Sequence, residues 1–166
     1  MGDARSYGLE LEGSYRPFKA LTLSTSLGWN ETEYRGFVLD RVSFVTGEEF
    51  ATDVSGNALA NAPASTALVA IDYAPRLAKN LRGEARVDYR RVGRFFTDIQ
   101  NAIEQEAYGL VNARVGVRWK GYELFVWGRN LNDAAYLAFG APDSSFGRRV
   151  RTAAPRTYGF TLSASF

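Results

Sequence analysis

The sequence predicts an all-β fold of about seven antiparallel strands, and three observations support it. First, 16 glycines and an aromatic content of 14% favour strands and turns over helices. Second, several segments alternate strictly between apolar and polar residues, which is the period of a strand. Third, short turns alternate with long connections along the chain. We expect strands near residues 5–15, 20–32, 65–74, 81–96, 107–119, 122–131 and 155–166.

The first three predicted strands each have an apolar face. In residues 7–15 the apolar positions are Tyr7, Leu9, Leu11 and Tyr15, and Gly13 is the one gap. In residues 21–30 they are Leu21, Leu23, Leu27 and Trp29, facing Thr22, Ser24, Ser26 and Asn30. The pattern is weaker in residues 67–73. A short turn at 16–19 and a long connection at 33–64 separate these strands.

The middle strands have an ionic second face. Residues 81–90 carry a charged row made of Arg82, Glu84, Arg86, Asp88 and Arg90, opposite small and apolar residues. Such a row either lines a solute path or, more often, only stabilises the wall. Residues 111–119 alternate in the same way. Residues 122–131 are apolar on both faces, which leaves open whether Leu124 and Val126 or Phe125 and Trp127 face outward.

The last predicted strand has an unbroken alternation. One face carries Tyr158, Phe160, Leu162, Ala164 and Phe166, and the other carries Thr157, Gly159, Thr161, Ser163 and Ser165. The remaining connections are short at 75–80 and 120–121, and long at 97–106 and 132–154. All five prolines lie in these connections or at strand starts, as a sheet that needs every backbone donor requires.

Strand length and aromatic placement favour a membrane barrel over a soluble one. About ten residues at about 3.3 Å each, tilted by about 40°, span roughly 25 Å, the height of the apolar band on outer-membrane barrels. Short turns alternating with long loops also fit such a barrel. Aromatic rings near strand ends would form its interfacial girdles; they are Tyr15, Trp29, Tyr73, Trp119, Tyr122 and Tyr158. We therefore predict antiparallel up-and-down transmembrane β-barrel strands with the ionic faces toward the lumen.

The composition excludes several other classes. The chain has no cysteine and no histidine, which excludes disulfides, thiolate or imidazole metal sites and histidine-based catalysis. We expect no enzyme activity, no catalytic residues, no metal site and no cofactor. A net charge of +2 with both signs interspersed gives no nucleic-acid stripe. No apolar run is long enough for a membrane helix, and the N-terminus is not a secretory signal.

Several motifs, in order, resemble the C-terminal part of TonB-dependent outer-membrane receptors. Residues 108–116 resemble the Tyr-x-Leu-Val-Asn-Ala-Arg-Val-Gly strand of that family, and residues 156–159 resemble its final Arg-Thr-Tyr-Gly strand, which ends here in Phe166. Residues 4–10 and 55–63 also look like segments of its ferric-siderophore receptors. Between them lies an Asn-Leu-x-Asp motif followed by Tyr136; it consists of Asn130, Leu131, Asn132 and Asp133, with Asn132 where Phe is commoner.

The resemblance implies that residues 1–166 are the C-terminal segment of a larger receptor barrel in a bacterial outer membrane. The family has an N-terminal plug domain and a box that engages TonB, and both are absent from this sequence. We expect a partial barrel, a native start upstream of Met1, and partners in the rest of the receptor, including the plug, and in TonB through the missing box. Outer-membrane lipid, lipopolysaccharide and the barrel assembly machinery are further expected partners, whereas nucleic acid is not.

The implied function is TonB-dependent import of a ferric siderophore, another metal chelate or a similar nutrient. Ferric chelates are often anionic and flat, so the candidate ligand-binding residues are cationic and aromatic loop residues. They are Tyr34 and Arg35 in the first long connection, and Phe146, Arg148, Arg149 and Arg151 in the last. Alternatively, the arginines bind lipopolysaccharide phosphates or are simply solvated.

The C-terminal strand also resembles the signal that the barrel assembly machinery reads, with Tyr158, Phe160, Leu162 and Phe166 as its candidate residues. These residues would face lipid in either case. Two other classes remain open from sequence alone. One is a barrel that does not use TonB, such as an autotransporter translocator or an adhesin. The other is a soluble lipocalin-like binding barrel with its apolar face inside.

Overall fold

The structure, a computed structural model, describes residues 2–42, 47–143 and 147–165. Its main element is one antiparallel sheet in which seven long strands follow one another in chain order. This confirms the all-β prediction and the strand number. The strands are β1 (Asp3–Phe18), β2 (Leu21–Arg35), β5 (Ser65–Tyr73), β7 (Leu81–Val92), β10 (Tyr108–Trp119), β11 (Tyr122–Arg129) and β14 (Thr157–Ala164).

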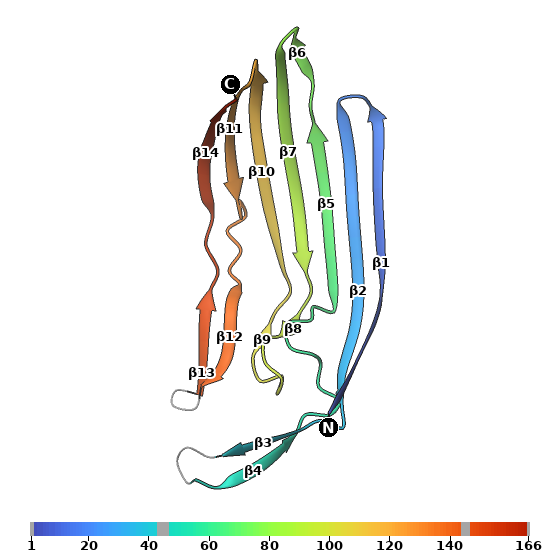
Figure 1. Cartoon of the computed structure of the whole chain (residues 1–166), viewed down its shortest axis with the longest axis vertical. Coiled ribbons are helices and arrows are strands. Elements are labelled where there is room, and N and C mark those ends of the chain that lie inside the picture. Colours follow the sequence, from blue (N-terminus) through green and yellow to red (C-terminus); the bar gives the residue numbers. More distant parts are fainter. Residues whose placement is uncertain (1, 43–46, 144–146, 166) are drawn as a thin grey trace.

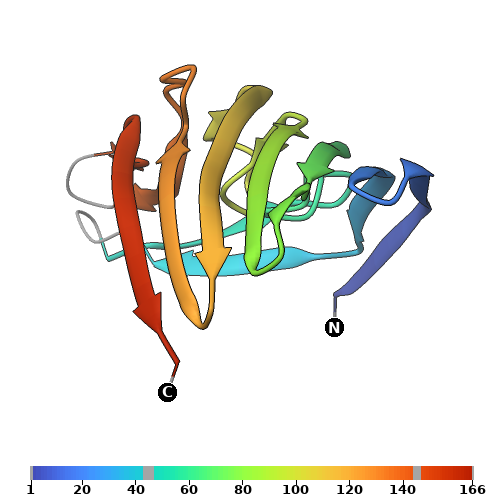
Figure 2. The same ribbon diagram turned by 90° about the horizontal axis from the view of Figure 1, so that it is seen from above.

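The sheet is curved and open. Short turns join the strands at one end, where the C-terminus also lies, and the long connections gather at the other end (Figure 1). Viewed from the short-turn end, the strands form a curved row that does not close (Figure 2). Within the described residues, β1 and β14 each pair on one side only. The expectation of a partial barrel is thus confirmed for this chain. We refer below to the short-turn end and the loop end.

The long connections contain secondary structure that the sequence did not predict. Each of the three holds a small two-stranded sheet, and the turn before β7 holds a short strand beside it. These strands are β3 (Val38–Val42) with β4 (Glu49–Asp53), β8 (Phe95–Phe96) with β9 (Glu104–Gln105), β12 (Leu137–Asp143) with β13 (Gly147–Thr152), and β6 (Arg76–Ala78) beside β7.

One predicted strand is shorter than expected. The sequence predicted a single strand over residues 81–96, but β7 ends at Val92 and Phe95 and Phe96 belong to the separate strand β8. β7 ends where its pairing with β10 ends, at Val92 opposite Tyr108, and Phe95 and Phe96 pair with β9 instead. Just after Val92, the N–H of Gly93 donates to the carbonyl of Ser65 at 2.7 Å. A Cβ at Gly93 would lie 2.9 Å from the Ser65 backbone nitrogen, so only glycine permits this approach.

The register aligns the apolar residues of neighbouring strands on one face. Val117, Leu124 and Leu162 form one such row across three strands, and Val115 is paired with Val126 in the next. Leu162 is 70% exposed. The register also settles the segment 122–131, because Leu124 and Val126 lie on this exposed face while Phe125, on the other face, is only 8% exposed.

The molecule has almost no dry core. The buried apolar side chains among the described residues are Val54, Ala70, Ile103 and Phe125. The leucines that a soluble barrel would enclose are instead exposed, Leu23 at 37% and Leu27 at 42%. The described residues contain no helix with the length and apolar character needed to cross a membrane. The apolar face therefore needs a covering other than the protein's own interior.

Candidate functional site

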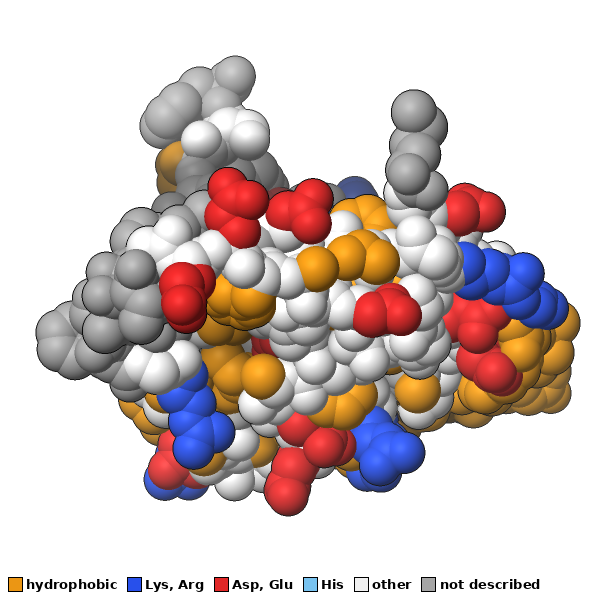
Figure 3. Space-filling model, turned by 90° about the horizontal axis from the view of Figure 1, so that it is seen from below, with side chains coloured by type: hydrophobic (Ala, Val, Ile, Leu, Met, Phe, Trp, Pro, Cys, Tyr) orange, Lys and Arg blue, Asp and Glu red, His pale blue; other side chains and the backbone are white. Residues whose placement is uncertain are grey.

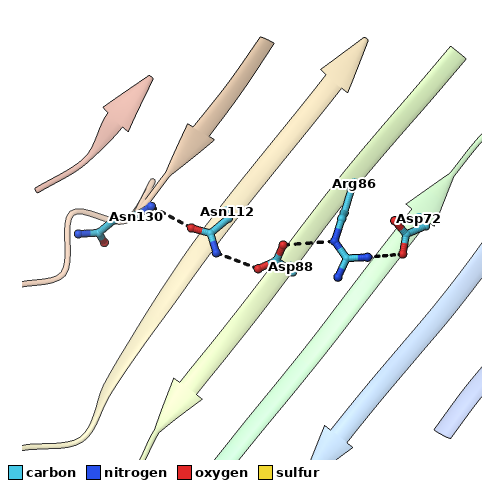
Figure 4. A network of polar contacts seen from close by, with 5 residues as sticks. All are labelled: Asp72, Arg86, Asp88, Asn112 and Asn130. Atoms are coloured by element: carbon cyan, nitrogen blue, oxygen red, sulfur yellow. Dashed lines mark hydrogen bonds and ion pairs between the residues drawn. The ribbon is translucent and has the colours of Figure 1, made fainter. Parts of the chain in front are cut away.

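The polar face of the sheet is held together by a chain of contacts that runs across three strands to the end of a fourth (Figure 4). Arg86 on β7 places Nη1 2.6 Å from Asp72 Oδ2 on β5, and its Nε lies 3.4 Å from Asp88 Oδ1. Asn112 on β10 donates through Nδ2 to Asp88 Oδ2 at 2.8 Å. The backbone N–H of Asn130, just after β11, donates to Asn112 Oδ1 at 3.1 Å. One polar network therefore links β5, β7, β10 and the end of β11.

A second set of ion pairs lies nearer the short turns. Arg118 on β10 contacts Glu84 on β7 at 3.0 Å and Glu123 on β11 at 2.9 Å. Because the Arg118 side chain is 46% exposed, solvent screens these pairs and each contributes little stability. Three members of the charged row predicted on residues 82–90, namely Glu84, Arg86 and Asp88, thus bridge neighbouring strands. This is the arrangement of a stabilised wall.

Between these two sets lies a hollow of about 500 Å³ that combines cations with aromatic rings. The guanidinium carbons of Arg114 and Arg118 lie 5.5 and 5.8 Å from the ring centre of Phe125. The guanidinium carbon of Arg129 lies 5.1 Å from the ring of Trp127. Such a surface suits flat, polar or anionic groups. Sequence reasoning missed it because both faces of this strand are apolar.

The second long connection is folded around one buried carboxylate. Asp98, which is 6% exposed, accepts hydrogen bonds from three backbone N–H groups. The donors are Gln100 at 3.0 Å, Ala102 at 3.1 Å and Ile103 at 2.7 Å. A carboxylate that satisfies several turn amides fixes the local conformation. The loop is therefore ordered by its own sequence.

This loop is attached to the first long connection through side-chain amides. Asn101 accepts from the N–H of Ala58 at 2.8 Å and donates to its carbonyl at 3.0 Å. Asn57 donates to the carbonyl of Ile99 at 3.1 Å. Asn101 has a positive φ of 55°, which asparagine tolerates better than most residues. The pairing ties residues 57–58 to residues 99–101.

The third long connection is attached to the second. The N–H of Leu137 donates to Gln105 Oε1 at 2.5 Å. The rings of Tyr108 and Tyr136 also stack, with centroids 4.3 Å apart and planes 12° apart. The three long connections thus form one interconnected assembly at the loop end. The sequence signals that could have indicated it are the asparagine and aspartate residues within segments predicted to be irregular.

The β3–β4 hairpin is closed by a short polar turn. Asp53 accepts hydrogen bonds from Ser55, from the hydroxyl at 2.5 Å and from the backbone N–H at 2.9 Å. These bonds favour the carboxylate and lower the pKa of Asp53 below its ordinary value of 3.8. Ser55 Oγ in turn accepts from the N–H of Phe37 at 3.0 Å. The start and the end of the hairpin are therefore joined.

The candidate ligand residues lie on two separate elements at the loop end. Tyr34 and Arg35 end β2; the ring of Tyr34 is 5.5 Å from that of Phe37, and Arg35 pairs with Glu33. Arg148, Arg149 and Arg151 lie on β13, where Arg149 and Arg151 share one face and Arg148 takes the other. Phe146 lies outside the described residues. Acidic side chains spread over this end of the molecule, together with basic ones (Figure 3).

The candidate assembly residues lie on β14, whose outer side is an unpaired edge in the described residues. Tyr158, Phe160 and Leu162 are 66%, 75% and 70% exposed on the apolar face. Phe166 lies outside the described residues. The strand therefore presents both an apolar row and free backbone groups at the same edge.

Comparisons with known proteins agree with the fold described above. The family model described as TonB dependent receptor-like, beta-barrel matches residues 1–131. Among solved structures, the ferric yersiniabactin uptake receptor FyuA from Yersinia pestis matches with a TM-score of 0.82 and 18% identity, covering 99% of this chain and 24% of FyuA. The siderophore receptor PiuA from Acinetobacter baumannii matches with a TM-score of 0.72 and 19% identity, covering 98% of this chain and 22% of PiuA. The chain thus spans about a quarter of their length, and at these identities the likeness shows the fold alone.

Proposed function

Because this chain belongs to the TonB-dependent receptor-like β-barrel family, we propose that it forms the C-terminal wall and outer loops of a receptor that imports a ferric siderophore or a similar metal chelate. The family consists of transport receptors of the bacterial outer membrane and is not an enzyme class. The observation that carries the proposal is the division of the sheet into one exposed apolar face and one ionic face. Such a division fits a wall between lipid and a water-filled lumen.

The orientation follows from the general plan of outer-membrane barrels. Their short turns lie in the periplasm and their long loops lie outside the cell. In this placement the C-terminus is periplasmic and the interconnected loops face the medium, where they also contact lipopolysaccharide. The hollow beside Phe125 and Trp127 then faces the lumen.

In this proposal the plug domain, the TonB box and the other barrel strands belong to the rest of the receptor. Residues 1–166 provide the last strands of the barrel, and the plug domain and the TonB box lie in a segment upstream. Two features support this: the chain spans about a quarter of the matched receptors, and among the described residues its sheet has two edges that are paired on one side only. An unpaired edge in lipid costs several kcal/mol for each bare amide or carbonyl, so further strands must cover both edges.

The ligand-binding groups in this proposal are the aromatic and cationic loop residues, namely Tyr34, Arg35, Phe146, Arg148, Arg149 and Arg151. Their support is chemical, because guanidinium groups and rings suit anionic, flat chelates. The ordered loop end adds to it, since loops that are already fixed lose less entropy on binding.

The proposal is tested by uptake of radioactive iron–siderophore complexes into cells that produce the receptor containing this chain. Uptake should require the receptor and disappear in a strain without TonB. Arg151→Gln should raise the half-saturating chelate concentration about fivefold, corresponding to about 1 kcal/mol for an exposed ionic contact. Arg16→Gln, near the end of β1 at the short-turn end and outside the candidate set, is the matched control. Uptake that persists without TonB would overturn the transport mechanism, and equal effects of the two substitutions would overturn the assignment of Arg151.

The other two classes are disfavoured by specific observations. The family match over residues 1–131 argues against an autotransporter translocator or an adhesin. The exposed leucines and the small core argue against a soluble lipocalin-like barrel, which would enclose its apolar face.

A further inference from the structure

The charged residues of the three short turns are all of one sign. The three turns, residues 16–20, 74–80 and 120–121, contain no aspartate or glutamate and five basic residues, Arg16, Lys19, Arg76, Lys79 and Lys120. The loop end differs, because there both signs occur (Figure 3). A one-sided distribution of this kind produces a positive potential at one end of the molecule.

Part of this charge gathers at a notch between two neighbouring hairpin tips. The tips belong to β7 and β10, which are adjacent in the sheet and pair Leu81 with Trp119 at this end. The notch has a volume of about 450 Å³. Its cationic lining consists of Arg76, Lys79, Arg82, Arg118 and Lys120, and the rings of Trp119 and Tyr122 also line it.

Most of the cations in the notch have no carboxylate partner. Arg118 is engaged by Glu84 and by Glu123, the one acidic residue of the lining. Within the described part of the chain, no ion pair involves Arg76, Lys79, Arg82 or Lys120. The guanidinium of Arg76 donates instead to the carbonyl of Lys79 at 3.1 Å, which brings the two cations together on one turn. The notch therefore presents unneutralised positive charge.

The notch also lies where the apolar face ends. Trp119 and Tyr122 are 50% and 48% exposed on that face, and their rings stack at 6.1 Å. The ammonium of Lys120 lies 5.3 Å from the centre of the Trp119 ring. Tryptophan and tyrosine favour the level of lipid headgroups, so the cations stand at the height of headgroup phosphates. An aqueous anion would find the same charge but would gain nothing from the adjoining apolar surface.

We propose that this notch is a binding site for the phosphate of an anionic glycerophospholipid in the membrane leaflet at the short-turn end. Lys79 and Lys120 contact the headgroup phosphate, and Arg76 fixes the turn that carries Lys79. The acyl chains extend along the apolar face beside Trp119. The proposal rests on the membrane placement given above, but it does not depend on which ligand the receptor imports.

The test measures lipid retention by native mass spectrometry on the whole receptor, released from nanodiscs of phosphatidylglycerol and phosphatidylethanolamine. Lys79→Gln with Lys120→Gln removes two notch cations. The control, Arg16→Gln with Lys19→Gln, removes the same charge from the turn between β1 and β2. At about 4.8 Å per strand this turn lies about 14 Å from the notch, which exceeds the electrostatic screening length of about 8 Å. At about 1 kcal/mol per cation near a headgroup, the notch variant should lose about 30-fold in preference for phosphatidylglycerol. The control should keep it.

Three outcomes decide the matter once heat-modifiable migration on gels has shown that both variants fold. Selective loss in the notch variant supports the site. Equal loss in the two variants overturns it, because diffuse attraction would then explain the preference. Displacement of the retained lipid by millimolar inorganic phosphate would overturn the assignment to a lipid, since the notch would then bind any phosphate. Iron uptake by the notch variant should stay unchanged, so a failed lipid site is distinguishable from a failed transport proposal.

Discussion

Replacing Asn130 with alanine should release the third long connection from the wall. Asn130 follows β11, is 5% exposed and has a positive φ of 51°. Its Oδ1 accepts from the N–H of Ala134 at 2.9 Å, and its Nδ2 donates to the carbonyls of Ala134 at 3.0 Å and Ala154 at 3.4 Å. One side chain therefore holds both ends of residues 134–154.

The size of the effect follows from these contacts. Each of the two shorter hydrogen bonds contributes about 1 kcal/mol net, and a left-handed conformation costs an ordinary residue about 1 kcal/mol more. Asn130→Ala should therefore lower the local opening free energy by about 3 kcal/mol. Asn130→Gly loses the bonds but tolerates the backbone, so its effect should be about 2 kcal/mol. The difference between the two variants measures the cost of the left-handed backbone conformation at this position.

Amide hydrogen exchange of the whole receptor, followed by mass spectrometry of peptides covering residues 131–137, measures this opening. The two variants should exchange about 150-fold and about 30-fold faster than the parent protein. Asn61→Ala is a control, since Asn61 also has a positive φ, of 59°, but lies in the first long connection. Acceleration below about threefold in Asn130→Ala would refute the argument, because it would mean that neighbouring contacts hold the loop without this side chain.

Three further predictions concern the membrane face, the pH response and assembly. Val126→Lys should destabilise folding into lipid bilayers by about 2–4 kcal/mol, whereas Thr161→Lys on the polar face should not, and denaturant titration compares them; equal losses would contradict the assignment of faces. Hydrogen bonds from Ser55 lower the pKa of Asp53, so this stabilisation is present above 3.8 and lost as pH falls below it. Exchange of hairpin β3–β4, corrected for intrinsic rates, should rise in acid, and Asp53→Asn should abolish that response; an unchanged response would refute it. Deleting Phe166 should reduce the assembled receptor in outer-membrane fractions, and undiminished assembly would count against the signal on β14.

Most of the seven strands were predictable because an alternating apolar and polar pattern repeats along each of them. In β14 the alternation from Thr157 onward has no exception, and a shift by one residue would reverse both faces. The segment 122–131 shows the limit of this approach. Its two faces are both apolar, so only pairing with β10 and β14 shows that Val126 lies outward and Phe125 inward. The motifs in residues 108–116 and 130–133 correctly indicated the family.

The polar face was predictable in its charges but not in its connections. The sequence placed Glu84, Arg86 and Asp88 on one face, yet their partners Arg118 and Asp72 lie on other strands. Which charges pair depends on the register between strands, and that register depends on turn lengths and bulges as well as on alternation. The proposed ligand residues remain a prediction, because their role depends on a bound chelate as much as on the fold.

The loop end shows why irregular segments resist prediction even when they are well ordered. Three asparagine side-chain amides here supply the hydrogen-bond partners that the backbone of a neighbouring strand would supply. Each accepts from a backbone N–H and donates to a backbone carbonyl. Asn101 does so with Ala58, Asn130 with Ala134, and Asn132 with the N–H of Val111 at 2.9 Å and the carbonyl of Gly109 at 2.8 Å. A primary amide can do this because it carries an acceptor and a donor side by side, as a peptide group does.

Asn132 gives this argument a consequence specific to this chain. The position is commonly phenylalanine in the receptors that the motif resembles, and a ring cannot form these two bonds. Here β10 extends beyond its pairing with β11, and the N–H of Leu131 together with the Asn132 amide continues the ladder along that free edge. A single residue, with no periodic pattern around it, thus sets how far the pairing with β10 reaches. The role of such a residue can be recognised only when its partner strand is known.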